Sequence, residues 1–444
     1  MKCAILAAGE GVRLRDISSG KPKGLIPLLG FTLIERVILC FRESGIRDFL
    51  IVTGYRADDL VNFLGNGGKY GVKLEFHYND KWQSGNGTSL YVLKDYLEKE
   101  RNFFVTMSDH IFQPEMTKEF TDHLDSDDIS ILCTQSKVNH TGNIADATKV
   151  RVNDKGYIEE IGKDLKQYNS IDCGLFYFTP DIFHALEIAS AKAKYALTDG
   201  AAVLVANEKL KSFDIKKYYW QDVDDKKDLQ TAGKKIISNL SSPRDGLVSK
   251  YLNRRLSIPL TRCAVRLPIS ANFVSFVSFL TGLFSGLLFF LGSPLLGGLI
   301  AQLCSVIDGM DGEIARLKFQ RSPFGGLFDS LLDRYADAAI IIGMSYFAYI
   351  KLPSLLPIVF GLLALVGSPM SMLFKERFHT AYGTAFVPEK MDGFTKYLVP
   401  NRDGRLFLIM LGGITSYILP VLIYLGTFAN LQVIYRLVAS ARKR

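Results

Sequence analysis

The carboxyl-terminal part of the chain consists of long apolar stretches separated by short polar ones, and this pattern restricts the fold more than any other feature. A helix needs about 20 mostly apolar residues to cross a bilayer, whose interior cannot hydrogen-bond an exposed backbone. Six stretches are candidate spans, although some are short or interrupted by acids: 269–291, 294–310, 326–350, 352–374, 406–418 and 419–437. We therefore expect residues 269–444 to form an all-α membrane domain of six transmembrane helices.

The preceding residues, 239–268, are expected to link this domain to the rest of the chain. Residues 239–244 (NLSSPR) are polar and break helices, which marks a domain boundary. Beyond them, four apolar residues share one helical face: Leu247, Val248, Tyr251 and Leu252. This pattern predicts an amphipathic helix that lies in the membrane interface, and a solvated linker helix is the alternative.

Residues 1–238 have a different pattern, in which apolar runs alternate with charged and turn residues. The expected elements are a helix at 57–64 and strands at 2–8, 49–53, 74–78 and 103–107. Repeated strand–helix units predict a doubly wound α/β domain with a mostly parallel sheet. No apolar signal segment follows Met1, so we expect this domain to lie in the cytoplasm.

The residues around the second and third candidate spans contain acids where the surrounding sequence is apolar. In helical segments, Asp308 and Asp311 (i, i+3) share one face, and so do Asp329 and Asp333 (i, i+4). Four ionised carboxylates at low dielectric need positive charge between them, and such oxygen ligands suit Mg²⁺ or Mn²⁺. The spacing predicts a divalent metal site, and the adjacent glycines would let the phosphates of a nucleotide approach the backbone. A pair of membrane helices whose acids are neutralised by arginine is the alternative.

These acids belong to a longer pattern, D-x2-D-G-x2-A-R-x8-G-x3-D-x3-D, which runs from Asp308 to Asp333. It resembles the signature of the CDP-alcohol phosphotransferases, membrane enzymes that transfer the phosphoalcohol of a CDP-alcohol to a second alcohol and release CMP. The resemblance implies that the four aspartates bind metal and that Asp333 is also the general base. It implies nucleotide binding at Gly312, Ala315, Arg316 and Gly325.

Near the amino terminus, residues 6–14 read L-A-A-G-x-G-x-R-L and residues 22–30 read P-K-x-L-I-P-L-x-G. A glycine-rich turn after a strand can hold phosphates through its backbone N–H groups. The two segments resemble the sugar-phosphate nucleotidyltransferases, which join an NTP to a phosphorylated small molecule. The resemblance implies catalytic cations at Arg13 and Lys23. It implies metal ligands at Asp109 and at Asp224, which we prefer to Asp222, and NTP contacts at Ala7, Ala8, Gly9, Gly11, Asn86, Thr88 and Ser89.

The loops on one side of the candidate spans are basic, which predicts a multi-pass cell-membrane protein with both termini in the cytoplasm. An acceptor phosphate near the acids would need basic partners, and four candidates lie between the fourth and fifth spans or at their ends: Arg377, Lys396, Arg402 and Arg405. Residues that only set the topology are the alternative for each. The net charge of +8 fits basic loops at a membrane surface, and no basic stripe with interleaved aromatics indicates nucleic-acid binding.

The two resemblances are complementary, because one domain would make a CDP-alcohol and the other would consume it. The combination resembles the family of bifunctional enzymes that join CTP:inositol-1-phosphate cytidylyltransferase to CDP-inositol:inositol-1-phosphate transferase. This implies CTP and inositol 1-phosphate as substrates, Mg²⁺ or Mn²⁺ as cofactor and di-myo-inositol phosphate phosphate as product. We also expect contact with membrane lipid and a homodimer. Two alternatives stay open: a phospholipid synthase that uses CDP-diacylglycerol, and a transporter or scaffold with an inert nucleotide-binding domain.

Overall fold

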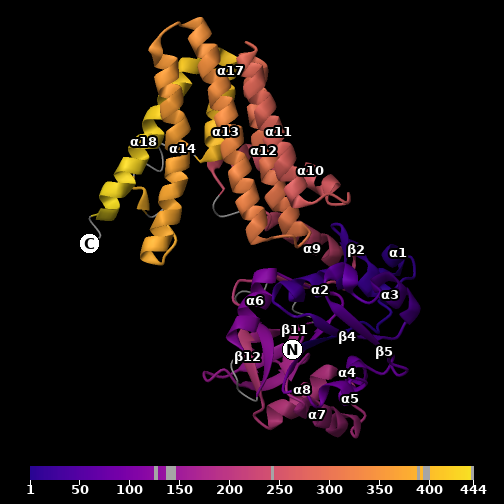
Figure 1. The fold of residues 1–444 in the computed structure, drawn as a ribbon. Helices are drawn as coiled ribbons and strands as arrows, with labels where there is room; N and C mark the ends of the chain where they lie inside the picture. Colours follow the sequence, from indigo (N-terminus) through magenta and orange to yellow (C-terminus); the bar gives the residue numbers. More distant parts are fainter. Residues whose placement is uncertain (125–128, 137–146, 242–244, 388–390, 394–400, 442–444) are drawn as a thin grey trace. The chain divides into compact units, whose positions relative to one another are not determined.

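The computed structural model describes residues 1–124, 129–136, 147–241, 245–387, 391–393 and 401–441. The chain forms two compact units, Met1–Ile236 (unit 1) and Ile237–Arg444 (unit 2). Unit 1 combines sheets with helices, whereas the described elements of unit 2 are all helical (Figure 1).

Unit 1 is built around a nine-stranded sheet in the order β10-β9-β11-β6-β1-β4-β5, in which β8 pairs with β11 and β12 pairs with β8. Its strands are β1 (Lys2–Leu6), β4 (Asp48–Thr53), β5 (Lys73–Tyr78), β6 (Phe103–Met107), β8 (Ser130–Ser136), β9 (Lys149–Val152), β10 (Ile158–Gly162), β11 (Ser170–Phe178) and β12 (Leu210–Asp214). Two small sheets pair β2 (Pro27–Leu28) with β3 (Phe31–Thr32), and β7 (His110–Phe112) with β13 (Trp220–Asp222). The four predicted strands are confirmed, and β6 has the predicted bounds.

The nine-stranded sheet is mixed, which corrects the prediction of a mostly parallel one. β6, β1, β4 and β5 are parallel neighbours, whereas β11 is antiparallel to β6, β8 and β9. The connections explain the difference, because parallel neighbours need a long crossover and antiparallel neighbours need only a short link. In the described residues 149–178, β9, β10 and β11 follow one another without an intervening helix. The doubly wound arrangement is therefore limited to the first half of the unit.

The helices of unit 1 are α1 (Arg15–Ser18), α2 (Leu33–Glu43), α3 (Ala57–Leu64), α4 (Asn86–Tyr91), α5 (Lys94–Leu97), α6 (Pro114–His123), α7 (Asp181–Ser190), α8 (Leu197–Ala206) and α9 (Lys226–Ser238). α2 begins at a capping box, in which the Thr32 hydroxyl accepts from the Glu35 N–H and the Glu35 carboxylate accepts from the Thr32 N–H. From this helix, the buried Arg36 donates to the carbonyls of Leu28 and Leu29, at 2.8 Å each. α2 thus anchors the loop whose sequence resembles that of nucleotidyltransferases.

In unit 2, α11 packs against α12 and α13, and α14 packs against α18 (Figure 1). The elements are a π-helical turn η4 (Ser249–Asn253) and the helices α10 (Arg254–Ala264), α11 (Ala271–Phe290), α12 (Pro294–Leu317), α13 (Pro323–Lys351), α14 (Leu355–Tyr382), α17 (Arg402–Thr415) and α18 (Ile418–Ala441). Among the described residues, four helices are long and apolar enough to cross a membrane, namely α11, α12, α14 and α18. Two predicted spans fall outside this set, because α13 carries several charged residues and α17 has only 14 residues.

The two faces of α11 show how such helices suit a membrane. The buried face consists mostly of small residues: Ala271, Val274, Ser275, Ser278, Gly282, Ser285, Gly286 and Phe289. The exposed face consists of large apolar ones: Phe273, Phe276, Leu280, Leu283, Phe284, Leu287 and Phe290. In lipid, helices associate through close packing of small residues rather than through the hydrophobic effect. The exposed phenylalanines and leucines are therefore suited to contact with acyl chains.

The segment before α11 is amphipathic, and its buried face is the polar one. Asn253, Ser257 and Thr261 are buried, whereas the apolar residues Leu247 and Tyr251 are 76% and 59% exposed. α10 packs its polar face against α12. The exposed side of this segment is therefore apolar, and its buried side is polar.

The crossing of α11 and α13 brings two glycines into direct contact, which gives a test of the packing. A Cβ atom on Gly343 would lie 2.1 Å from the Gly286 carbonyl oxygen, whereas one on Gly326, also in α13, meets nothing within 4 Å. We expect Gly343→Ala to lower the free energy of unfolding by about 1–3 kcal/mol, because the helices must separate. Thermal unfolding of the purified protein in detergent measures the effect. Gly326→Ala is the matched control, and equal midpoints for the two variants would contradict this helix crossing.

Candidate functional site

Unit 1 gathers acidic side chains at one edge of its main sheet. Asp109 follows the carboxyl end of β6, and the pairing of β7 with β13 sets Asp222 opposite His110. Asp224 lies two residues beyond the end of β13. Open α/β sheets bind their ligands at the carboxyl ends of parallel strands, so this position is where a site is expected.

The Lys23 ammonium group lies among these acids. Its Nζ is 2.5 Å from Asp109 Oδ2 and 2.6 Å from Asp224 Oδ1, and 3.9 Å from Asp222 Oδ1. A glycine makes this position accessible: Gly11 has φ +68°, and a Cβ there would lie 2.7 Å from the Lys23 Cβ. The glycine-rich turn and the lysine segment, which together carry the resemblance to nucleotidyltransferases, are thus packed against each other.

The other residues predicted in the first turn occupy different surroundings. Arg13 is exposed at the rim, with its Nη1 atom 3.4 Å from Asp224 Oδ2. Gly9 has open space around its Cα, because a Cβ there meets nothing within 4 Å. Ala7 and Ala8 are buried at the end of β1, where their backbone groups bond Val52 and Tyr55. The turn can therefore admit a ligand at Gly9 and present a cation at Arg13.

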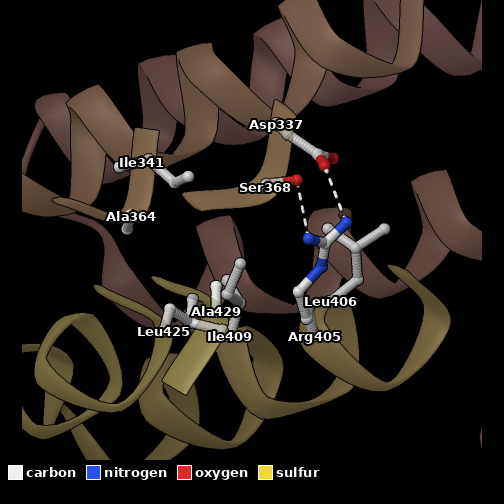
Figure 2. Close-up of a pocket in the computed structure, with 9 residues that line it drawn as sticks. All are labelled: Asp337, Ile341, Ala364, Ser368, Arg405, Leu406, Ile409, Leu425 and Ala429. Atoms are coloured by element: carbon white, nitrogen blue, oxygen red, sulfur yellow. Dashed lines mark hydrogen bonds and ion pairs between the residues drawn. The ribbon is translucent and has the colours of Figure 1, made fainter. Parts of the chain in front are cut away.

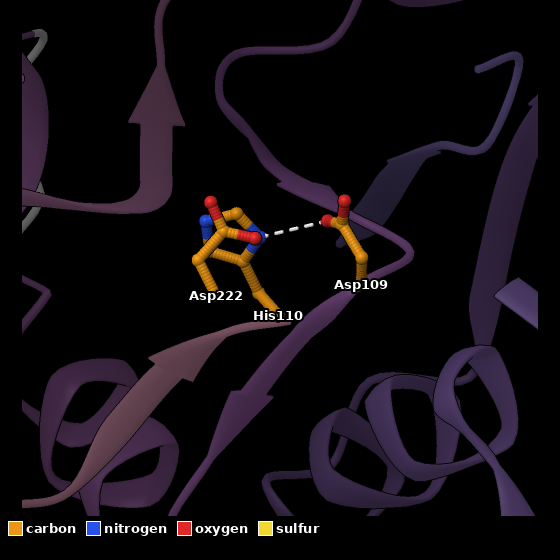
Figure 3. Close-up of side chains that lie close together, drawn as sticks. All are labelled: Asp109, His110 and Asp222. Carbon is orange, nitrogen blue, oxygen red and sulfur yellow. Dashed lines mark hydrogen bonds and ion pairs between the residues drawn. The ribbon is translucent and has the colours of Figure 1, made fainter. Parts of the chain in front are cut away.

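His110 lies beside Asp109 and Asp222, as Figure 3 shows. Its Nδ1 is 2.9 Å from Asp109 Oδ1, and its ring stacks on Trp220 at 6.1 Å between centroids. Burial lowers the pKa of His110, but the charge of Asp222 and the hydrogen bond with Asp109 outweigh burial and raise it to about 9. Burial would raise the pKa of Asp109, yet Lys23 and His110 hold it below its ordinary value.

The resemblance favoured Asp224 over Asp222 as the second metal ligand of unit 1. In the structure, single oxygen or nitrogen atoms of Asp109, His110 and Asp222 lie within 4.8 Å of one another, a spacing compatible with one metal ion. The Oδ1 atom of Asp222 is also buried without a hydrogen bond. The strand pairing that brings His110 and Asp222 together involves residues more than a hundred positions apart, so local spacing could not reveal it.

The side chains of Asn86, Thr88 and Ser89, which were predicted to contact the NTP, are all engaged within the protein. Asn86 Oδ1 accepts from the Leu197 N–H at 2.8 Å. The Thr88 hydroxyl donates to the Gly85 carbonyl at 2.7 Å, and the buried Ser89 hydroxyl accepts from Asn79 at 2.9 Å. These bonds fix the turn that begins α4, so recognition of a base at this turn would depend more on its backbone and shape than on these side chains.

In unit 2, the aspartates of α12 and α13 converge as their spacing predicted. Single carboxylate oxygens of Asp308, Asp311 and Asp329 lie within 4.8 Å of one another. Asp311 also accepts from the Ser275 hydroxyl of α11 at 2.5 Å and from the Gly312 N–H. Clustered carboxylate and hydroxyl oxygens are the donor set that Mg²⁺ and Mn²⁺ prefer.

Asp333 lies beside this cluster and is held by arginine from α17. Arg402 Nη1 is 2.8 Å from both Asp308 Oδ1 and Asp333 Oδ1, and its Nε is 3.0 Å from Asp337 Oδ1. Arg405 donates to the Ser368 hydroxyl at 2.6 Å and to Asp337 at 3.3 Å, as Figure 2 shows. Asp337 was not singled out from the sequence. Its position four residues after Asp333 continues the same helical face and was the available signal.

A cavity of about 850 Å³ in unit 2 is lined by apolar side chains and by both basic and acidic ones. The basic residues are Arg334, Lys375, Arg402, Arg405 and Arg436, and the acidic ones are Asp245, Asp392 and Asp403. Two of the four basic residues predicted to bind an acceptor phosphate therefore line it, and Lys396 lies outside the described residues. Arg377 is exposed and does not line the cavity, whereas Lys375 does, because residues two positions apart on a helix face in different directions.

The motif glycines of α12 are close to arginine side chains. A Cβ on Gly309 would lie 3.3 Å from Arg254 Nη1, and one on Gly312 would lie 3.3 Å from Arg316 Nη1. Two nitrogens of the Arg316 guanidinium are buried without a hydrogen bond. Ala315, Arg316 and Gly325 are partly exposed, and Gly326 is exposed. Gly309 and Gly312 thus leave room for the guanidinium groups of Arg254 and Arg316.

Comparison with known proteins gives matches to both units. The chain matches the nucleotidyl transferase family over residues 2–239 and the CDP-alcohol phosphatidyltransferase family over residues 268–400. The bifunctional IPC transferase and DIPP synthase of Aquifex aeolicus is 32% identical, with 99% of this chain and 98% of that protein covered. The protein of the same name from Thermococcus kodakarensis is 32% identical, with 92% and 89% covered. The solved structure of the inositol-1-phosphate CTP transferase from T. maritima is 26% identical, covers 53% of this chain and 96% of that one, and has a TM-score of 0.46.

The two acid clusters predict two independent classes of divalent-cation site. We expect Mn²⁺ titration of the full chain, followed by electron paramagnetic resonance, to detect both. Asp109→Asn should weaken Mn²⁺ binding at one class of site and Asp311→Asn at the other, each by about 10-fold or more. Residues that only hydrogen-bond to a metal ligand already contribute that much to metal affinity, so loss of a ligand should cost at least as much. Asp164→Asn, at an exposed acid, is the control. A binding curve unchanged by Asp311→Asn would remove that residue from the metal site.

Proposed function

The chain belongs to the family of bifunctional IPC transferases and DIPP synthases, and from this we propose that its two sites catalyse successive transferase reactions. Unit 1 makes CDP-inositol from CTP and inositol 1-phosphate. Unit 2 transfers the phosphoinositol group to a second inositol phosphate, which gives di-myo-inositol phosphate phosphate. The observation that carries this proposal is the presence of a complete acid–cation cluster in each unit.

In unit 1, a phosphate oxygen of inositol 1-phosphate attacks the α-phosphorus of CTP, and pyrophosphate leaves. The reaction needs positioned positive charge rather than covalent chemistry from the protein. Lys23 and Arg13 supply charge to the triphosphate, and the carboxylates of Asp109 and Asp224, with Asp222 beside them, hold Mg²⁺. The bound Mg²⁺ would neutralise charge that develops on the phosphates.

In unit 2, a hydroxyl of the second inositol phosphate attacks the β-phosphorus of CDP-inositol, and the bond from that phosphorus to the bridging oxygen breaks to release CMP. Asp333 takes the proton of the attacking hydroxyl. Asp308, Asp311 and Asp329 hold Mg²⁺ or Mn²⁺, which would neutralise the diphosphate. Arg316 contacts the nucleotide phosphates, a role supported by its unbonded, buried guanidinium nitrogens.

The acceptor phosphate binds in the cavity of about 850 Å³ in unit 2. Arg402 connects this cavity to the reaction centre, because it lines the cavity and pairs with Asp308 and Asp333. Arg405 also lines it, and its planar guanidinium, which bonds Ser368 and Asp337 in this structure, is a group that suits phosphate. The cavity is large enough for a polyol phosphate, since ligand sites commonly have volumes of about 300–1,000 Å³.

The protein spans the cell membrane with six helices. These are the four long apolar helices together with α13 and α17. Polar groups of α13 are paired inside the bundle, through Asp333 and Asp337 with Arg402, which would remove much of the cost of a charged span. The segment 245–268 lies in the interface, where its exposed Leu247 and Tyr251 contact lipid. Basic loops support cytoplasmic termini and a cytoplasmic unit 1. A homodimer is part of the same proposal.

Two substitutions should separate the half-reactions. Lys23→Ala should lower CDP-inositol synthesis by about 100-fold or more, because it removes the charge nearest the metal ligands, and should leave consumption of supplied CDP-inositol unchanged. Asp333→Asn should leave CDP-inositol synthesis unchanged and lower CMP release by about 100-fold or more, because the proton acceptor is lost. Product analysis by mass spectrometry with CTP, Mg²⁺ and inositol 1-phosphate measures both. If Lys23→Ala retains full synthesis, the assignment of unit 1 is wrong.

The acceptor site is tested by Arg405→Gln. Loss of the fork should raise the KM for the acceptor inositol phosphate by about 10- to 100-fold, the contribution of a hydrogen bond to a charged group. Asp337 keeps its contact with Arg402 in this variant, so the helix pair retains its main ion pair. Arg377→Gln, at the exposed position on α14, is the matched control. If the KM for the acceptor is the same in Arg405→Gln, Arg377→Gln and the wild-type protein, the acceptor phosphate does not bind at Arg405.

A further inference from the structure

A buried glutamate joins the juxtamembrane segment to the helix that carries the first two metal-binding aspartates. Glu313 lies on α12 two residues after Asp311, and its side chain is 0% exposed. Its carboxylate accepts from the hydroxyls of Ser257 and Thr261 at 2.6 Å each and from Arg254 Nη1 at 2.5 Å. A buried carboxylate with all its partners in place has little freedom to move, because loss of any one leaves an uncompensated group.

Arg254 makes contacts in three directions from the centre of this network. Its Nε and Nη2 atoms donate to the two oxygens of Asp245 at 2.8 and 2.9 Å. Its Nη1 atom donates both to Glu313 and, at 3.0 Å, to the carbonyl oxygen of Gly309. Gly309 lies between Asp308 and Asp311, and a Cβ there would lie 3.3 Å from the same Nη1 atom. The guanidinium therefore bonds the backbone of the turn that carries two metal-binding aspartates.

The same segment is attached to α12 one turn earlier and to α17. Asn253 donates to the Ser305 hydroxyl at 2.9 Å and accepts from Gln302 at 2.6 Å. The Ser249 N–H donates to Asp403 at 2.7 Å, next to the Arg402 that pairs with Asp308 and Asp333. The segment thus touches both the helix of the aspartates and the helix of the arginine that faces them.

We propose that Arg254 is a positioning residue for the transferase site of unit 2. With Asp245 and Glu313, it fixes the rotation of α12 that directs Asp308 and Asp311 toward Asp329. The proposal rests on the proposed function of unit 2. A guanidinium is required, because its planar fork bonds Asp245 while the remaining N–H groups reach Glu313 and Gly309. A lysine at this position supplies the charge, but all its N–H donors lie on one nitrogen, so it cannot bond Asp245, Glu313 and Gly309 in the same geometry.

The test uses Arg254→Lys in the full chain, because this variant keeps a positive charge beside both buried carboxylates. We expect a fall in Mn²⁺ affinity of the unit 2 sites, read by electron paramagnetic resonance, of about 10-fold, the scale of outer partners in metal sites. The Mg²⁺ concentration for half-maximal CMP release from supplied CDP-inositol should rise similarly. Arg266→Lys, an exposed arginine in the same segment, is the control and should have no effect.

CDP-inositol synthesis by unit 1 of the same preparation shows whether the variant chain is intact. Glu313→Gln provides a second variant, because glutamine can still accept from Ser257 and Thr261 but cannot pair with the cation. It should weaken Mn²⁺ binding in the same direction. Wild-type Mn²⁺ affinity in both variants would overturn the proposal. Absence of CMP release by the wild-type chain would instead refute the proposed function, and the Mn²⁺ measurement would still decide the role of Arg254.

Discussion

The carboxylates buried between α12 and α13 remain ionised only if positive charge lies among them, and the arrangement of unit 2 follows from this requirement. Arg402 lies between Asp308 and Asp333, and Asp337 accepts from Arg402 and Arg405. Each of these carboxylates would cost several kcal/mol to bury if it were ionised and unpaired. The arginines of α17 therefore hold the acid helices together in a way that apolar contacts between helices in lipid would not.

Unit 1 meets the same electrostatic condition in a different solvent. There a single ammonium, Lys23, bonds Asp109 and Asp224, and the His110 ring lies beside Asp109. These side chains come from loops at a sheet edge, where water and substrate have access. In unit 2 the acids lie within α12 and α13, and Arg402 is the first residue of α17. Both arrangements concentrate positive charge where phosphate must bind. The side chains that supply this charge come from different kinds of secondary structure in the two units.

Much of this organisation could be predicted from the sequence, because the signals were local. The helix at 57–64, the strand at 103–107 and the convergence of Asp308, Asp311 and Asp329 all follow from periodicity within one or two segments. The antiparallel half of the sheet and the pairing of Asp222 with His110 depend on contacts between distant segments, which periodicity does not encode. Similarly, a basic loop indicated phosphate binding, but only the helix rotation distinguishes Lys375 from Arg377.

The small-residue face of α11 has a consequence for how this sequence can vary. Where Gly286 meets Gly343, backbone touches backbone, so a single added methyl group has no space. On the opposite face, Phe276 or Leu283 can be replaced by other large apolar residues, because fluid acyl chains adapt to any shape. Substitutions should therefore accumulate on the exposed face of α11 and be excluded from its buried face. The smallest residues, such as Gly286, are then the ones that the packing of this fold requires.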